Sequence, residues 1–171
     1  IDRIEREIQH AKVGKPARIR AKMNSLIEPS VIDALYRASS AGVQIDLIVR
    51  GMCTLRPGVK GLSENIRVRS IIGRQLEHSR VYCFHNNGAD DTFISSADWM
   101  GRNFFRRIEV ATPITTPELK ARVIREGIEM ALQDNTRAWL MQPDGSYLRA
   151  CPENGEPAFS LQESLWEMYG R

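Results

Sequence analysis

The spacing of apolar residues alternates between two periods along the first two thirds of the chain, and this alternation narrows the folds that the chain can form. Residues 17–24 (ARIRAKMN) are typical of a strand, and residues 43–51 form a second strand, rich in Val, Ile and Leu. Between them, residues 28–42 have Pro29 at a first helical position, apolar residues at helical spacing and Gly42 as a stop. A strand, a helix and a strand joined by short turns predict a parallel crossover unit, so the fold class is α/β.

Further elements of both kinds follow along the chain. Strands are predicted over residues 65–72, 79–84, 91–96 and 108–114, and a helix is predicted from Pro117 to about Asp134. Pro143-Asp144-Gly145 between two apolar runs predicts a hairpin, and residues 157–171 predict a short amphipathic helix. We therefore expect one domain over residues 1–171. It consists of a mixed sheet flanked by helices over about residues 11–135, with the hairpin and final helix of about residues 136–171 as an appendage.

Length and composition exclude several classes of protein. A chain of 171 residues, of which 42% are hydrophobic, can bury the core of one domain. No apolar run reaches the roughly 18 residues of a membrane span, and the charged start does not resemble a signal peptide. We expect a cytoplasmic protein, free or at the membrane periphery. Cys53, Cys83 and Cys151 are far apart and form no CxxC, so neither a disulfide framework nor a protein metal site is expected.

Positive charge is concentrated in the middle of the chain. The net charge is +3, but residues 50–107 contain ten Lys or Arg against five Asp or Glu, which is +5 there and −2 elsewhere. Nine of those ten cations are arginine, whose planar guanidinium suits phosphate oxygens. A polyanionic ligand is therefore favoured, with ordinary solvated surface charge as the alternative.

A histidine and an arginine lie two positions apart in residues 75–84 (QLEHSRVYCF). Alternate side chains of a strand point to the same face, so His78 and Arg80 are expected to contact one ligand together. An imidazole can act as nucleophile, acid or base, and a neighbouring cation can hold phosphate oxygens. A structural histidine on a strand is the alternative.

A glycine-rich loop follows one of the predicted parallel strands. Residues 51–65 contain Gly51, Gly58 and Gly61, and they leave the carboxyl end of the strand that Arg50 closes. Open α/β sheets bind ligands at the carboxyl ends of their strands. Arg50 is therefore a second candidate for binding an anionic ligand.

The order of these polar residues resembles the pattern of the phospholipase D superfamily. That pattern is H-x-K, four residues, Asp, and later G-S-x-N; here His78 and Arg80 are followed by His85, and the chain continues with S-S-x-D ending at Asp98. Arg80 replaces the lysine and His85 replaces the aspartate, and both changes argue against hydrolysis of phosphodiesters.

A closer resemblance covers about residues 11–147. The stretches PARIRAKMNSL, VQIDLIVRGMCTLRPG, LSENIRVRSIIGRQLEHSRVY, ISSADWMGRNFFRRIEVATPI and QPDGSY resemble the C-terminal, second phospholipase D-like domain of the bacterial, histidine-phosphorylating polyphosphate kinase family. The resemblance implies reversible transfer of the ATP γ-phosphate to polyphosphate through a phosphohistidine on a preceding domain. His78 then matches the second, non-phosphorylated active-site histidine, and Arg50 matches an arginine that binds nucleotide phosphate.

The same resemblance implies the partners. We expect ATP or ADP with Mg²⁺, polyphosphate, the remaining domains of a parent chain and a homo-oligomer, but no nucleic acid and no membrane span. The expected catalytic residue is His78, and Arg50, His78 and Arg80 are expected to bind ATP or phosphate. Arg56, Arg102 and Arg106 are expected to line a path for polyphosphate. The alternatives are a phospholipase D-like nuclease or phosphodiesterase and a non-catalytic module that binds polyanions.

Overall fold

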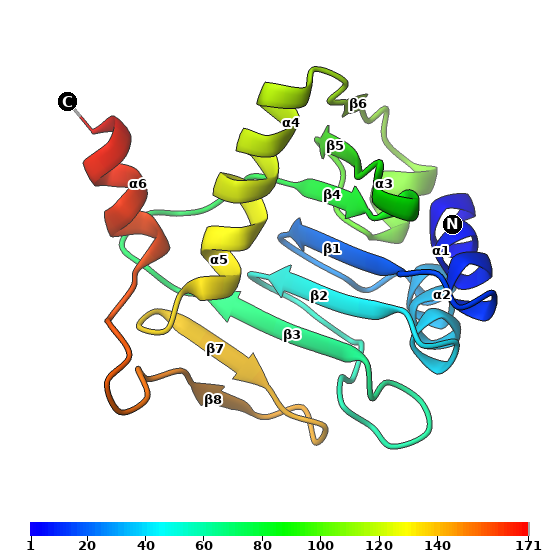
Figure 1. Ribbon diagram of the computed structural model, residues 1–171, viewed down its shortest axis with the longest axis horizontal. Helices are drawn as coiled ribbons and strands as arrows, with labels where there is room; N and C mark the ends of the chain where they lie inside the picture. Colours follow the sequence, from blue (N-terminus) through cyan, green and yellow to red (C-terminus); the bar gives the residue numbers. More distant parts are fainter. Residues whose placement is uncertain (171) are drawn as a thin grey trace.

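An eight-stranded mixed sheet forms the centre of the molecule (Figure 1). The computed structural model describes residues 1–170. The strands lie in the order β6-β5-β4-β1-β2-β3-β7-β8. Their bounds are β1 Arg18–Met23, β2 Gln44–Val49, β3 Ile66–Ile71, β4 Val81–Phe84, β5 Asp91–Ser95, β6 Ala111–Pro113, β7 Ala138–Met141 and β8 Tyr147–Arg149.

The three central strands are parallel, and the sequence predicted this arrangement for the first two of them. β1 pairs with β2 and β2 pairs with β3 in parallel, while β4 and β7 pair antiparallel with β1 and β3. Helix α2 (Pro29–Ser40) connects β1 to β2 and completes the crossover unit. Gly42, at φ +95°, follows this helix in the left-handed conformation that glycine adopts without strain. The carboxyl ends of β1 and β2 therefore lie side by side.

Helices cover both faces of the sheet. Helices α1 (Asp2–Lys12) and α2 lie on one face over the larger core, to which alternate residues of the central strands contribute. On the other face a second core forms beneath the helical run from Pro117 to Gln133 and beneath α6 (Leu161–Tyr169). The buried members of this second core are Ile48, Ile71, Val81, Ile128, Met130, Ala131 and Leu161.

The predicted long helix forms with an irregular middle. It consists of α4 (Pro117–Ile124), a π-helical turn η2 (Arg125–Glu129) and α5 (Met130–Gln133). Gly127 lies so close to β4 that a Cβ there would lie 3.0 Å from Val81 Cγ2. A π turn adds one residue to a helical turn, and here it contains Gly127, which packs against Val81 of β4.

Two predicted strands differ in extent from the structure, and two short helices were missed. The strand expected over residues 79–84 begins only at Val81, because its partners on β1 are Ile19 to Lys22. The strand expected over residues 108–114 is reduced to β6, and Ile108 is fully exposed. Two short helices were not predicted, namely η1 (Asn86–Gly88) and α3 (Gly101–Phe105).

The C-terminal hairpin is continuous with the sheet. β7 pairs with β3 and with β8, so the residues expected to form an appendage supply one edge of the main sheet. Leu161 of α6 is fully buried in the second core. Within residues 1–170, no helix combines the length and the apolar character needed to cross a membrane.

Candidate functional site

The candidate site forms around residues 73–80, which we call the His78 segment. This segment has no regular secondary structure and connects β3 to β4 past the carboxyl ends of β1 and β2. An irregular segment needs tertiary contacts to hold a side chain in one position. The structure provides such contacts at Gln75, Glu77 and Arg80.

Glu77 ties the segment to the central strands. Arg50, which follows β2, donates from Nη1 to the Glu77 carbonyl at 2.8 Å. The Glu77 carboxylate forms an ion pair with Lys22 of β1, and both side chains are largely buried. Arg50 thereby holds the backbone next to His78. The sequence selected Arg50 and His78 by separate arguments, and the structure brings the two residues together.

Gln162 of α6 ties down the start of the segment. Its side-chain amide accepts from the Gln75 N–H and donates to the Gln75 carbonyl, both at 2.8 Å, as a neighbouring strand would. It also donates to Glu77 Oε1 at 3.0 Å. The C-terminal helix thus contacts the segment that carries His78.

Arg80 connects the other end of the segment to Asp98. Its Nε and Nη2 each donate to one carboxylate oxygen of Asp98 at 3.1 Å. Its Nη1 lies 3.0 Å from His78 Nδ1 and 3.1 Å from the His78 carbonyl. His78 and Arg80 meet as predicted, but strand alternation is not the reason, because both residues precede β4. The arginine side chain instead folds back onto the imidazole.

Asp98 occupies a buried position with several donors. It is 3% exposed and accepts from the backbone N–H of Asn24 at 2.7 Å and of Ser25 at 3.3 Å. Burial raises the pKa of Asp98, but the hydrogen bonds from Arg80 and Asn24 outweigh it, so that the net pKa is lowered. With its oxygen turned toward Arg80, the Asn24 amide accepts from Arg80 Nη2 at 2.8 Å and donates to the Glu77 carbonyl at 3.1 Å.

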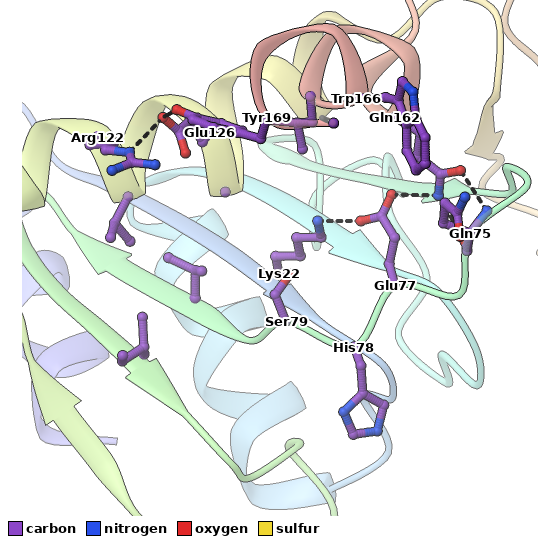
Figure 2. A pocket seen from close by; sticks show the side chains of 16 residues that line it. Lys22, Gln75, Glu77, His78, Ser79, Arg122, Glu126, Gln162, Trp166 and Tyr169 are labelled. Carbon is purple, nitrogen blue, oxygen red and sulfur yellow. Dashed lines mark hydrogen bonds and ion pairs between the residues drawn. The ribbon is translucent and has the colours of Figure 1, made fainter.

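A cavity of about 690 Å³ lies beside the His78 segment, between that segment, α4, η2 and α6. Figure 2 shows Lys22 and Glu77 pointing toward one another inside it, with Gln162 and Trp166 above. The His78 ring points away from this ion pair. His78 is exposed, so a ligand can reach it.

The other predicted arginines lie outside the cavity beside His78. Arg56 follows Leu55 in the loop after β2, Arg102 is in α3 and Arg106 follows α3; all three side chains are exposed. None of them is among the described residues that line the cavity beside His78. Their role in binding polyphosphate stays a prediction.

Sequence reasoning missed three residues that position the His78 segment: Lys22, Glu77 and Gln162. One indication of Lys22 is present in the sequence, because this charged residue lies between Ala21 and Met23 near the end of a predicted strand. Gln162 carried none, because a glutamine on an amphipathic helix is an ordinary surface residue until the helix is placed. Within residues 1–170, no group of three or more His, Cys, Asp or Glu side chains is arranged to hold a metal ion.

The fold is an α/β fold of the phospholipase D type. NucT from Helicobacter pylori superposes with a TM-score of 0.53 at 15% identity, covering 77% of this chain and 88% of that one. Nuc from Salmonella typhimurium, a phospholipase D family member, superposes with a TM-score of 0.54 at 14% identity, covering 80% and 88%. These identities show a shared fold only.

The chain belongs to the family "polyphosphate kinase C-terminal domain 2", whose model matches residues 1–162. A polyphosphate kinase of Neisseria meningitidis serogroup C is 82% identical over 170 residues, which is 99% of this chain and 25% of the relative. One from Burkholderia vietnamiensis is 64% identical over 149 residues, which is 87% of this chain and 22% of the relative. The predicted family resemblance is confirmed.

A solved structure agrees with this assignment. The crystal structure of polyphosphate kinase from Porphyromonas gingivalis superposes with a TM-score of 0.93 at 43% identity, over 99% of this chain and 26% of that one. The chain therefore spans about a quarter of the length of the proteins that it matches.

Proposed function

We propose that the chain is one part of an ATP:polyphosphate phosphotransferase, which moves the γ-phosphate of ATP reversibly onto polyphosphate. Family membership supports the reaction class. The observation that carries the assignment of the site is the bond from Arg50 Nη1 to the carbonyl of Glu77, because it holds a phosphate-binding cation beside His78.

Arg50 binds nucleotide phosphate in this proposal. Within residues 1–170, only its Nη1 has a hydrogen-bond partner, so its other N–H groups are available to phosphate oxygens. Because Nη1 of the guanidinium is bonded to the Glu77 carbonyl, the remaining N–H groups point in a fixed direction, which favours bidentate contact with a phosphate.

His78 acts on the phosphoryl group during transfer. The residue is exposed, and its Nδ1 is held by Arg80 Nη1. The imidazole is therefore positioned to form a hydrogen bond with an oxygen that gains charge in the transition state. The histidine that becomes phosphorylated belongs to another part of the parent protein in this proposal, and His78 stays unphosphorylated.

Magnesium accompanies the nucleotide. The described residues contain no cluster of acidic side chains that would hold the ion, so the chain does not fit the role of a metal cage. In phosphoryl transfer, Mg²⁺ is commonly held by the phosphates themselves.

Polyphosphate follows the exposed arginines Arg56, Arg102 and Arg106, and ADP leaves from the Arg50 side. The remaining domains of the parent chain complete the site, in a homo-oligomer that works in the cytoplasm or at the membrane periphery.

The test uses γ-labelled ATP with magnesium, added in parallel to the full-length parent enzyme and to the 171-residue chain. The full-length enzyme is expected to make labelled polymer. The chain alone is expected to make none and to carry no stable label, because a positioned neighbour cannot replace a missing nucleophile. Failure of the full-length enzyme to form polymer would overturn the proposal. Stable label on His78 of the chain alone would favour a covalent mechanism of the nuclease type.

A further inference from the structure

We propose that Arg80 and Asp98 fix the tautomer of His78, so that the ring presents an N–H at Nε2 and donates a hydrogen bond to the phosphoryl group instead of attacking it. Only the identity of the ligand, a phosphoryl oxygen, rests on the proposed function. The tautomer itself follows from the contacts of the imidazole.

The guanidinium decides where the imidazole proton lies. Arg80 Nη1 is 3.0 Å from His78 Nδ1, and a guanidinium has donors but no acceptor. Nδ1 must therefore be the acceptor and carry the lone pair. In the neutral ring the single proton then lies on Nε2.

The guanidinium has little freedom to turn away. Its Nε and Nη2 hold the two oxygens of Asp98, and its Nη1 also donates to the His78 carbonyl at 3.1 Å. Asp98 is itself held by the backbone N–H groups of Asn24 and Ser25. The side chains of Arg80 and Asp98 are only 10% and 5% exposed. The donor that faces Nδ1 is thus fixed by a buried, bidentate ion pair.

No carboxylate takes the place of that donor. The carboxylate of Glu77, the residue next to His78, binds Lys22 and Gln162, and the His78 ring points away from this pair (Figure 2). Within residues 1–170, no Asp or Glu side chain bonds to the His78 ring. A carboxylate would accept a hydrogen bond from an Nδ1–H and leave the lone pair on Nε2, whereas the arginine produces the opposite arrangement.

The difference in tautomer is a difference in chemistry. A nitrogen attacks phosphorus with its lone pair, and an exposed Nε2 that carries a proton has no lone pair to use. The same N–H is a suitable donor to a phosphoryl oxygen that gains negative charge. Arg80 is therefore a positioning residue for His78, and Asp98 positions Arg80.

Nuclear magnetic resonance of the 171-residue chain with ¹⁵N-labelled histidine tests the tautomer directly. Long-range ¹H–¹⁵N correlation spectra distinguish the two neutral forms of an imidazole, and a His78→Asn variant assigns the His78 signals among the three histidines. In the spectrum of the neutral ring, we expect the Nε2–H form to dominate. A dominant Nδ1–H form in the unmodified chain would overturn the inference, and this readout needs no variant that might unfold.

Variants then test whether Arg80 and Asp98 fix the tautomer of His78. Arg80→Met should give a mixture of the two tautomers, Asp98→Asn a smaller change in the same direction, and the matched control Arg102→Met, at an exposed arginine, no change. An unchanged Nε2–H form in a folded Arg80→Met chain would show that Arg80 does not fix it.

Kinetics of the full-length enzyme supply the functional readout. Arg80→Met should lower kcat by about tenfold or more with little change in the KM for ATP, and Arg80→Lys, which keeps one donor, should recover part of the loss. A rise in KM alone would assign Arg80 to substrate binding and overturn its positioning role. If the full-length enzyme makes no polymer, the proposed function fails, while the spectroscopic result still decides the tautomer.

Discussion

Asp98 holds the guanidinium of Arg80 on one side, and the imidazole of His78 contacts it on the other. A lysine at position 80 would have a single ammonium group. Unlike the planar guanidinium, it could not bind both carboxylate oxygens of Asp98 and also donate to His78 Nδ1. The arginine that departs from the phospholipase D pattern thus has a structural reason that the sequence alone did not show.

The first prediction separates the roles of Arg50 and His78 in the full-length enzyme. Arg50→Ala should raise the KM for ATP, roughly ten- to hundredfold, because it removes charge-assisted hydrogen bonds made in the ground state and in the transition state. His78→Ala should act mainly on kcat, by roughly 10²- to 10⁴-fold.

Steady-state kinetics with varied ATP measure this contrast, after circular dichroism has shown that the variants fold. Arg149→Ala and His85→Ala are matched controls outside the site and should leave both constants near normal. Near-normal kcat in His78→Ala would make His78 a structural residue.

The second prediction concerns the free energy of unfolding at acidic pH. The pKa of Asp98 is lowered in the folded protein, so its charged form stabilises the fold above the unfolded-state pKa, and this contribution is lost as pH falls through the folded value. At pH 7, Asp98→Asn should reduce the free energy of unfolding by roughly 3 kcal/mol, the lower end for a broken buried ion pair. The difference from the unmodified chain should shrink as pH falls below about 4.

Urea unfolding of the chain between pH 7 and pH 3 measures this difference. Asp33→Asn changes an exposed carboxylate on α2 and is the matched control. A difference that stays constant over the whole pH range would exclude the charge of Asp98 as its cause.

The His78 segment is the element that the sequence described least well. Periodic patterns predicted the central strands and the main helices, because the spacing of apolar residues within each segment indicates its secondary structure. The ends of β4 and β6 and the π turn η2 depend on pairing and on the close approach of a helix to the sheet, which only the folded chain determines. The sequence therefore selected His78 and Arg50 as candidates, which stay predictions, but it placed His78 on a strand.

The third prediction tests whether α6 positions that segment. Gln162→Ala should lower kcat of the full-length enzyme by roughly ten- to hundredfold, because a small displacement of a catalytic group is costly. Hydrogen exchange over residues 73–80 should become faster. Gln142→Ala, in the C-terminal hairpin, is the control and should change neither quantity.

A second variant reaches the same contact from the other side. A Cβ on Gly73 would lie 2.2 Å from Gln162 Oε1, so Gly73→Ala should push the amide away and reproduce the effect of Gln162→Ala. Normal activity in both variants would exclude a positioning role for α6.

Charge is a property of the whole molecule, and the fourth prediction addresses it. The chain should bind polyphosphate weakly, with an affinity that falls between about 50 and 200 mM salt as counterions are released. Arg56→Glu, Arg102→Glu and Arg106→Glu together should weaken binding more than the control Lys12→Glu, Lys15→Glu and Arg125→Glu, which changes net charge equally. Titration of both triple variants at two salt concentrations decides this, and equal losses would leave only net charge as the cause.

The two cores also determine the order in which a newly made chain can complete its fold. Every buried member of the larger core lies between Ile4 and Trp99, whereas the second core needs Leu161. During translation the first core can form before residues 117–169 have been made, whereas the core around Ile48, Ile71 and Val81 is complete only once the helical run over residues 117–133 and α6 have been synthesised. Until then the nascent chain exposes an apolar sheet face of the kind that chaperones bind. Helix α6 also brings Gln162 to the His78 segment, so this segment cannot reach its final geometry until α6 has been synthesised.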